Sequence, residues 1–294
     1  MRVLVTGGAG FIGRHVVEAL HTRGHAVTVV DRRDHHGVDV VGDLREAAVR
    51  EAAVTPGLDA VVHLAAETSV LGSMERPALV HEVNVTVTAE LAELARARGV
   101  GAFVLASSNA VVGEHDGTMC EQVALAPLTP YGATKAAAEM VLSGYAGAYG
   151  LRTPRLRLGN VYGPGMTEKD SFVPRLMRAA ADGTAVEIYG DGRQVRDLVH
   201  VGDVALAFVL AAEGWPSGPV IIGSGVSPTV LDVLEAARRC TGRPIEAVHV
   251  RAKPGEMRGV VLDTALARSR GWAPRLSLDE GLRDAWADFA PIAS

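Results

Sequence analysis

The chain reads Thr6-Gly7-Gly8-Ala9-Gly10-Phe11-Ile12-Gly13 directly after the short apolar run Val3-Leu4-Val5. The residues from Phe11 to Thr22 then place apolar side chains at helical spacing, so the glycines stand between a strand and a helix. Such glycines permit a tight turn, let the backbone approach a pyrophosphate and let the helix pack on the strand. The N–H groups and the dipole of the helix N-terminus attract the phosphate charge. This stretch predicts a dinucleotide-binding turn.

Asp31 ends the next apolar run, Ala26 to Val30. Its carboxylate can accept hydrogen bonds from the adenosine ribose and would repel a 2′-phosphate, which favours NAD over NADP. Arg32 and Arg33 leave an alternative, because they either receive a 2′-phosphate or stay solvated loop charges. Asp43 also has two interpretations, a cap for the adjacent turn or a contact to the adenine amino group.

Short apolar runs alternate with helical patterns through the first half of the chain. The predicted strands are Val3 to Val5, Ala26 to Val30, Ala60 to Val62 and Ala102 to Leu105, and the predicted helices include Phe11 to Thr22 and His81 to Arg98. This rhythm implies an α/β fold, a Rossmann-type doubly wound parallel sheet with right-handed crossovers. The ligand of such a sheet lies at the carboxyl ends of its strands.

The rhythm changes after about residue 160, where Gly163-Pro164-Gly165 and Gly190-Asp191-Gly192 separate shorter elements. We therefore expect a smaller C-terminal lobe that binds substrate. We assign 1–160 to an NAD-binding Rossmann domain, rejoined by about 197–212, and 161–294 mainly to the substrate-binding lobe. Because no long linker or repeat is found, the lobes should pack together around a cleft.

Composition argues against several classes of protein. The 294 residues carry a net charge of −5 with acidic and basic residues interleaved, so no basic face for nucleic acid is expected. Cys120, Cys240 and the pair His35-His36 lack the spacing of metal ligands, so we expect no metal. The first apolar run is far shorter than the roughly 20 residues that span a bilayer. We expect a cytoplasmic protein without a membrane segment.

Tyr131-Gly132-Ala133-Thr134-Lys135 begins a helical stretch that runs to about Tyr149. Tyr131 and Lys135 are thus one turn apart on the same helix face, and a lysine so placed lowers the pKa of a tyrosine. Ser107-Ser108 ends a predicted strand upstream. A phenolate near a nicotinamide ring can remove a hydroxyl proton while hydride leaves the same carbon, with the serine hydroxyl holding the substrate oxygen.

At this point the sequence resembles the extended short-chain dehydrogenase/reductases, and especially the UDP-sugar 4-epimerases, over essentially its whole length. Several further motifs carry the resemblance: His63-Leu64-Ala65-Ala66, Asn84-Val85, Arg157-Leu158-Gly159-Asn160-Val161-Tyr162-Gly163-Pro164, and Tyr189-Gly190-Asp191-Gly192 followed by Arg196-Asp197. The resemblance implies Ser108, Tyr131 and Lys135 as catalytic residues. It also favours the adenine contact for Asp43.

The resemblance further implies two sets of binding residues. The NAD set is Gly7, Gly10, Phe11, Ile12, Gly13, Asp31, Arg32, Asp43, Leu44, Leu64, Ala65, Ala66, Asn84, Tyr131 and Lys135. The substrate set is Ser108, Asn109, Tyr131, Asn160, Val173, Tyr189, Arg196, Lys253 and Glu256. Asn160 and Arg196 are implied to contact the sugar-nucleotide diphosphate, although a turn cap and a local ion pair with Asp197 are their structural alternatives.

The residues after the catalytic serine bear on the reaction. Related 4,6-dehydratases carry Thr-Asp-Glu there, whereas this chain has Ser108-Asn109-Ala110 without a carboxyl group. Decarboxylating members tend to carry glutamate, and 3,5-epimerising members cysteine, at the place of Ala110. Two departures, Val112 where many members have tyrosine and Lys253 where many epimerases have arginine, put the nucleotide fit in doubt.

We therefore expect an NAD-dependent 4-epimerase, an isomerase that acts on a nucleotide sugar, UDP-glucose, UDP-galactose or UDP-glucuronate, through a transient 4-keto sugar. The alternatives are an NAD(P)H-dependent 4-ketoreductase and a non-enzymatic NAD(P)-sensing protein. An intact Tyr131 to Lys135 motif argues against the sensor. By the same resemblance, helices 81–98 and 131–149 could form a homodimer interface.

Overall fold

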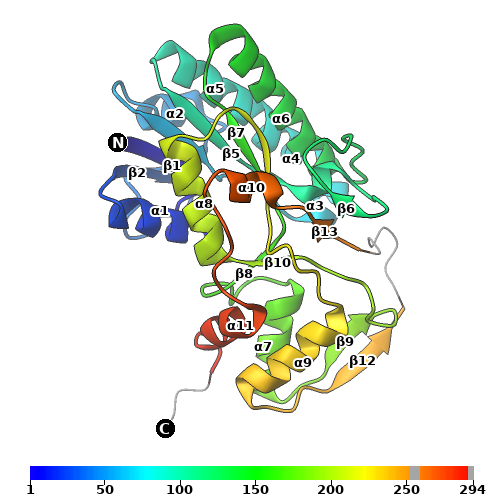
Figure 1. Cartoon of the computed structure of the whole chain (residues 1–294). Helices are drawn as coiled ribbons and strands as arrows, with labels where there is room; N and C mark the ends of the chain where they lie inside the picture. Colours follow the sequence, from blue (N-terminus) through cyan, green and yellow to red (C-terminus); the bar gives the residue numbers. More distant parts are fainter. Residues whose placement is uncertain (252–258, 291–294) are drawn as a thin grey trace.

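The computed structural model describes residues 1–251 and 259–290. A seven-stranded, fully parallel sheet lies in the upper lobe of Figure 1, in the order β11-β7-β5-β4-β1-β2-β3. Its strands are β1 (Arg2–Thr6), β2 (Ala26–Asp31), β3 (Val40–Val41), β4 (Ala60–His63), β5 (Ala102–Ser108), β7 (Pro154–Leu158) and β11 (Gly218–Ile222). The α/β Rossmann-type prediction is confirmed.

The central strands are buried on both faces, as parallel strands between two helix layers must be. In β1, Val3 and Val5 point into one core while Leu4 points into the other. The first core is shared with α1 (Phe11–Thr22) and α8 (Val201–Glu213), and the second with α5 (Val87–Ala97) and α6 (Pro130–Tyr149). Continuous Val and Leu runs follow from this double burial.

The remaining helices of the upper lobe are short. They are α2 (Ala47–Ala53), α3 (Val70–Glu75), α4 (Pro77–His81) and α10 (Ala265–Ser269), with a π-helical turn η1 (Glu82–Thr86) and a 3₁₀ turn η2 (Asn109–Val111). The helix predicted from His81 to Arg98 is thus α5 preceded by a π turn. A π turn inserts an extra residue into the helix, and here it contains the buried Asn84.

The lower lobe in Figure 1 packs α7 (Phe172–Asp182), α9 (Val230–Thr241) and α11 (Leu278–Trp286) beside the parallel pair β9 (Val186–Tyr189) and β12 (Ala247–Val250). It has its own core, with Leu176, Ile188 and Leu234 among the buried side chains. Two further pairs complete the strands, β8 (Asn160–Tyr162) with β10 (Leu198–His200), and β6 (Thr118–Met119) with β13 (Val261–Leu262).

The chain crosses between the lobes several times. After β10 it returns to the sheet as α8 and β11, so the sheet extends to Ile222, beyond the 197–212 segment expected from the sequence. It returns again as α10, where Trp272 is buried in the first core. Within the described residues, no helix is long and apolar enough to cross a membrane. The carboxyl ends of β5 and β7 reach the cavity that the lower lobe also lines, through Ser108 and Leu158.

Candidate active site

The glycine turn leaves the N-terminus of α1 open to a ligand. Gly7 has φ of +72°, and a Cβ there would lie 2.7 Å from the Ala65 nitrogen. A Cβ on Gly13 would lie 2.7 Å from Gly8 Cα and closer still to the Gly7 carbonyl oxygen. Gly10 caps α1 without a side-chain bond, and the first turn of α1 carries no acid. The terminal N–H groups of α1 are therefore available to an anion such as a pyrophosphate.

Asp31 is tied to this turn. Its carboxylate is 7% exposed and accepts hydrogen bonds at 3.0 Å from the main-chain nitrogens of Ala9 and Arg33. Arg33 bends back so that its Nη2 donates to the Ala9 carbonyl at 3.1 Å, while Arg32 donates to Glu67 at 3.0 Å. Both arginines thus have protein partners, which makes a fixed site for a 2′-phosphate less favourable.

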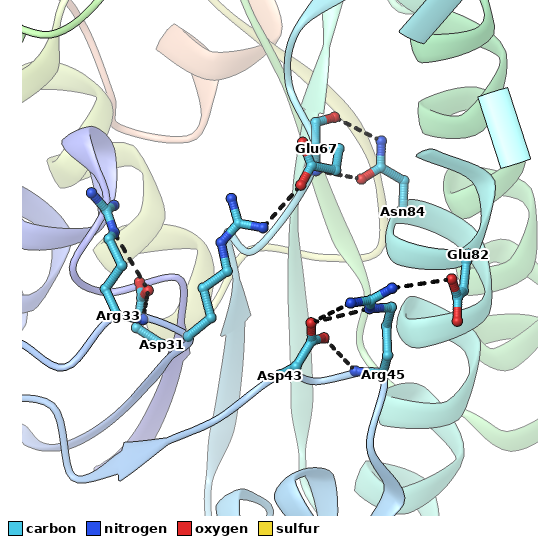
Figure 2. A network of polar contacts seen from close by, with 8 residues as sticks. Asp31, Arg33, Asp43, Arg45, Glu67, Glu82 and Asn84 are labelled. Carbon is cyan, nitrogen blue, oxygen red and sulfur yellow. Dashed lines mark hydrogen bonds and ion pairs between the residues drawn. The ribbon is translucent and has the colours of Figure 1, made fainter. Parts of the chain in front are cut away.

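Asp43 caps the turn that follows it. It accepts from the Arg45 main-chain nitrogen at 2.9 Å and from the Arg45 guanidinium at 2.8 Å (Figure 2). The hydrogen bond from Arg45 holds the pKa of Asp43 below its ordinary value. Leu44 is buried in the second core, and its contact to the cofactor stays a prediction. The adenine contact of Asp43 remains a prediction beside this turn-capping role.

His63 fixes the loop that carries Leu64, Ala65 and Ala66. Its Nδ1 lies 2.7 Å from Thr6 Oγ1 and its Nε2 lies 3.0 Å from Thr88 Oγ1. Because the Thr88 hydroxyl already donates to the Asn84 carbonyl, His63 must donate from Nε2, and in the neutral ring its Nδ1 then accepts from Thr6 Oγ1. Burial and the Lys135 charge lower the pKa of His63 to about 3, so it is neutral. Ala65 N also donates to Thr6 Oγ1, at 3.2 Å.

Asn84 is engaged by the protein itself. Its amide accepts from Glu67 N at 2.9 Å and donates to Glu67 O at 3.0 Å (Figure 2). It also donates to Thr134 Oγ1 at 3.1 Å, and Thr134 in turn donates to the Tyr131 carbonyl. The side chain thus connects the loop after β4 to the first turn of α6. This contact set supports a positioning role, and a direct contact of Asn84 to a cofactor stays a prediction.

Tyr131, Ser108 and Lys135 converge at the carboxyl end of β5. Thr129 caps α6, which places Tyr131 in its first turn and Lys135 one turn later. Burial raises the pKa of Tyr131, and a hydrogen bond with the Ser108 hydroxyl opposes that rise. Lys135 is 4% exposed, and its Nζ donates to the Ala106 carbonyl at 2.9 Å. Burial lowers the pKa of Lys135 to about 8, which leaves it largely protonated at neutral pH.

A cavity of about 510 Å³ opens above these residues, between the two lobes. Such a volume suits a nucleotide sugar with the end of a cofactor. Eight of the sequence-predicted residues line it: Phe11, Ile12, Ser108, Tyr131, Asn160, Val173, Tyr189 and Arg196. Asn109 is not among the lining residues, and its Oδ1 lies 3.4 Å from Ser108 Oγ. Lys253 and Glu256 lie outside the described residues.

The lower lobe supplies the opposite wall. Asn160 pairs with Asp197, since its main-chain and side-chain nitrogens both donate to the Asp197 carbonyl, at 3.0 and 3.2 Å. The buried Asp197 carboxylate accepts from Ser224 N at 2.6 Å and from Gly225 N at 2.9 Å. Arg196 Nη1 donates to the Val195 carbonyl at 2.9 Å. These bonds hold the segment that presents Arg196 to the cavity.

Sequence motifs did not identify seven further polar or aromatic residues of the wall, which are Thr68, Lys169, Ser171, Phe172, Arg175, Glu187 and Gln194. Arg175 stacks over the Tyr189 ring, with 5.6 Å from guanidinium carbon to ring centroid, and its Nη2 donates to the Glu187 carbonyl at 3.2 Å. The only sequence signal for Arg175 is its helical spacing from Val173 in α7. Within the described chain, no group of three or more His, Cys, Asp or Glu could hold a metal.

A parallel Rossmann sheet with a Tyr, Ser and Lys cluster at its carboxyl edge defines a short-chain dehydrogenase/reductase of the extended, two-lobed kind. The chain belongs to the NAD dependent epimerase/dehydratase family, whose model matches residues 3–223. It is similar to the UDP-glucose 4-epimerase of Corynebacterium glutamicum, 32% identical over 98% of this chain and 95% of that one.

Two further similarities bear on cofactor and reaction. The crystal structure of the Thermus thermophilus UDP-glucose 4-epimerase with NAD has a TM-score of 0.91 and 37% identity, covering 98% of this chain and 99% of that one. A dTDP-glucose 4,6-dehydratase of Actinoplanes is 32% identical over 97% of both chains. Both reactions of the family therefore occur among relatives of similar identity, so the side chains of the cavity must discriminate between them.

Proposed function

We propose that this protein is an NAD-dependent 4-epimerase of a UDP-linked sugar. The proposal rests on which side chains of the cavity can exchange a proton with the substrate. Among its lining residues, Tyr131 is the group suited to exchange a proton with a sugar hydroxyl at the catalytic edge. Among the lining residues that the structure describes, the one carboxylate is Glu187, which lies in the lower lobe beside Arg175. Elimination needs a second acid and base, whereas epimerisation at C4 needs only one such group.

The residues of the first lobe fit NAD. The open N-terminus of α1 and the close approach at Gly7 and Gly13 suit a pyrophosphate, and a Cβ at either glycine would meet backbone atoms. Asp31 would hold the adenosine ribose, and Lys135 the nicotinamide ribose. Bound NAD would supply a reversible acceptor for the hydride on C4.

Tyr131 removes the proton from O4 and returns it once the hydrogen on C4 has come back to the other face. Burial raises the pKa of Tyr131, and the hydrogen bond with Ser108 opposes that rise. Lys135 lies one helical turn further along α6, and its ammonium would favour the phenolate, because a nearby cation stabilises the charged form. Ser108 donates to the substrate oxygen and holds it beside Tyr131. Asn160 and Arg196 retain the diphosphate while the 4-keto sugar rotates about its phosphate linkage.

Two neighbouring assignments belong to the same proposal. We assign the chain to the cytoplasm, since Cys120 and Cys240 are both free thiols. We assign a homodimer built on α5 and α6, because Met140 and Tyr149 on α6 are 61% and 59% exposed. Light scattering of wild type and Met140→Glu tests the dimer, and a monomeric wild type would contradict it.

The function is tested by following the hydrogen on C4. UDP-glucose, UDP-galactose, UDP-glucuronate and UDP-N-acetylglucosamine, each deuterated at C4, are incubated with purified protein without added cofactor. We expect inversion at C4 of at least one sugar with the label retained. Transfer of the label to C6 would indicate a dehydratase. In a parallel incubation with a 4-keto nucleotide sugar, turnover only with added NAD(P)H would indicate a ketoreductase. Loss of the C4 label to water would contradict the mechanism.

A further inference from the structure

A buried ionic cluster lies directly behind the catalytic edge, and the proposed reaction does not use it. Glu139 on α6 and Arg157 on β7 form a salt bridge of 2.8 Å, with side chains only 3% and 4% exposed. Arg157 Nε donates to both carboxylate oxygens, at 3.0 and 3.2 Å. Ser107 Oγ donates to Glu139 Oε1 at 2.5 Å. The carboxylate therefore accepts from two elements of the sheet at once.

Three consecutive residues at the end of β5 connect this cluster to the reacting groups. The Ala106 carbonyl accepts from Lys135 Nζ, Ser107 donates to Glu139, and Ser108 bonds Tyr131. Lys135 and Glu139 are four residues apart on α6, so they share one face of the helix. The end of β5 is thus hydrogen-bonded to three successive turns of α6. A shift of Ser107 would therefore also move Ser108 and the Ala106 carbonyl that accepts from Lys135.

The cluster also has an excess of positive charge. Lys135, Arg155 and Arg157 are all buried, and Glu139 is the carboxylate buried with them. His63 is neutral, because burial lowers its pKa to about 3. Arg155 Nε has no hydrogen-bond partner among the described residues, and burial lowers the pKa of Arg155. A protonated lysine in such a place depends on the nearest anion, because burial disfavours the charged form.

We propose that Glu139 is a positioning residue for the reaction, which fixes the end of β5 through Ser107 and keeps Lys135 protonated beside Tyr131. This inference rests on the proposed function for its catalytic consequence, but its electrostatic half does not. The Glu139 charge opposes the burial that lowers the pKa of Lys135. Replacing it with a neutral amide should therefore lower that pKa further, because the burial of Lys135 is then no longer opposed.

The chain offers an unusually direct test, because it contains only three lysines, Lys135, Lys169 and Lys253. In protein labelled with ¹³Cε-lysine, Lys169→Arg and Lys253→Arg assign the Lys135 signal. We expect Glu139→Gln to lower the titration midpoint of Lys135 by about one pH unit, a tenfold change in its proton dissociation constant. The alkaline limb of the kcat profile should move by the same amount. An unchanged midpoint in folded Glu139→Gln would overturn the proposal.

Three controls separate charge, position and stability. Asp203→Asn removes another buried carboxylate, 1% exposed and bonded to Arg275, and should leave the Lys135 midpoint unchanged. Ser107→Ala should lower kcat by about tenfold with the midpoint unchanged, and full activity would refute the positioning half. Glu139→Asp keeps the charge, should keep the midpoint within a few tenths of a unit, and remains informative if Glu139→Gln does not fold. If wild type inverts no sugar, the proposed function fails while the NMR titration still tests the charge.

Discussion

Replacing Tyr131 with phenylalanine removes one oxygen atom from the cavity and leaves the ring in the first turn of α6. The hydroxyl has one described side-chain partner, Ser108. Loss of a single neutral hydrogen bond costs about 1 kcal/mol of stability, which for a chain of this length lowers Tm by roughly 2–4 °C. Loss of the general base costs about 10²–10⁴-fold in rate, or roughly 2.7–5.5 kcal/mol of transition-state stabilisation. The loss of transition-state stabilisation should thus be several times larger than the loss of folding free energy.

The assay measures initial rates of UDP-galactose conversion, thermal unfolding and calorimetric UDP-sugar binding on the same preparation. Tyr145→Phe is the matched control, since Tyr145 lies on the same helix and donates to Glu93 at 3.2 Å, away from the cavity. It should show a similar small change in Tm with an unchanged kcat. If Tyr131→Phe retains more than about a tenth of the wild-type kcat, Tyr131 is not the base.

Three further predictions concern the cofactor turn and its supports. Calorimetry should show NAD binding at least tenfold tighter than NADP because of Asp31; equal or tighter NADP binding would shift the cofactor contact to Arg32 and Arg33. Gly13→Ala should abolish NAD binding measured by fluorescence, because its Cβ would lie 2.7 Å from Gly8 Cα, and retained affinity would contradict the close packing of the turn. His63 has a pKa of about 3 when folded against an ordinary 6.5, so the unfolded state binds more protons between these values. The urea-derived free energy of unfolding should fall as pH drops from 6.5 towards 3, and less steeply in His63→Asn.

The sequence predicts the sheet edge well because its signals are local. A glycine turn, the double-faced apolar strands and the spacing of Tyr131 from Lys135 all depend on residues within one or two turns of each other. The helix expected from His81 to Arg98 was less accurate. Its apolar periodicity fits a continuous α-helix. The π turn is explained only by the hydrogen bonds of Asn84 to Glu67 and Thr134. Those partners are 17 and 50 residues away, beyond any periodic signal.

The same distinction explains which site residues were missed. Motif comparison yields Asn160 and Arg196, whereas Lys169 and Arg175 reach the cavity only because α7 and the loop before it fold over the carboxyl edge of the sheet. The buried cluster is an intermediate case. Glu139 stands four residues after Lys135, which by sequence alone indicates a surface ion pair on an exposed helix. In the structure that face packs against β5 and β7, so Glu139 is buried and is not a solvated charge. Ser107 and Arg157 then bind Glu139, and these bonds are the basis of its proposed support of Lys135.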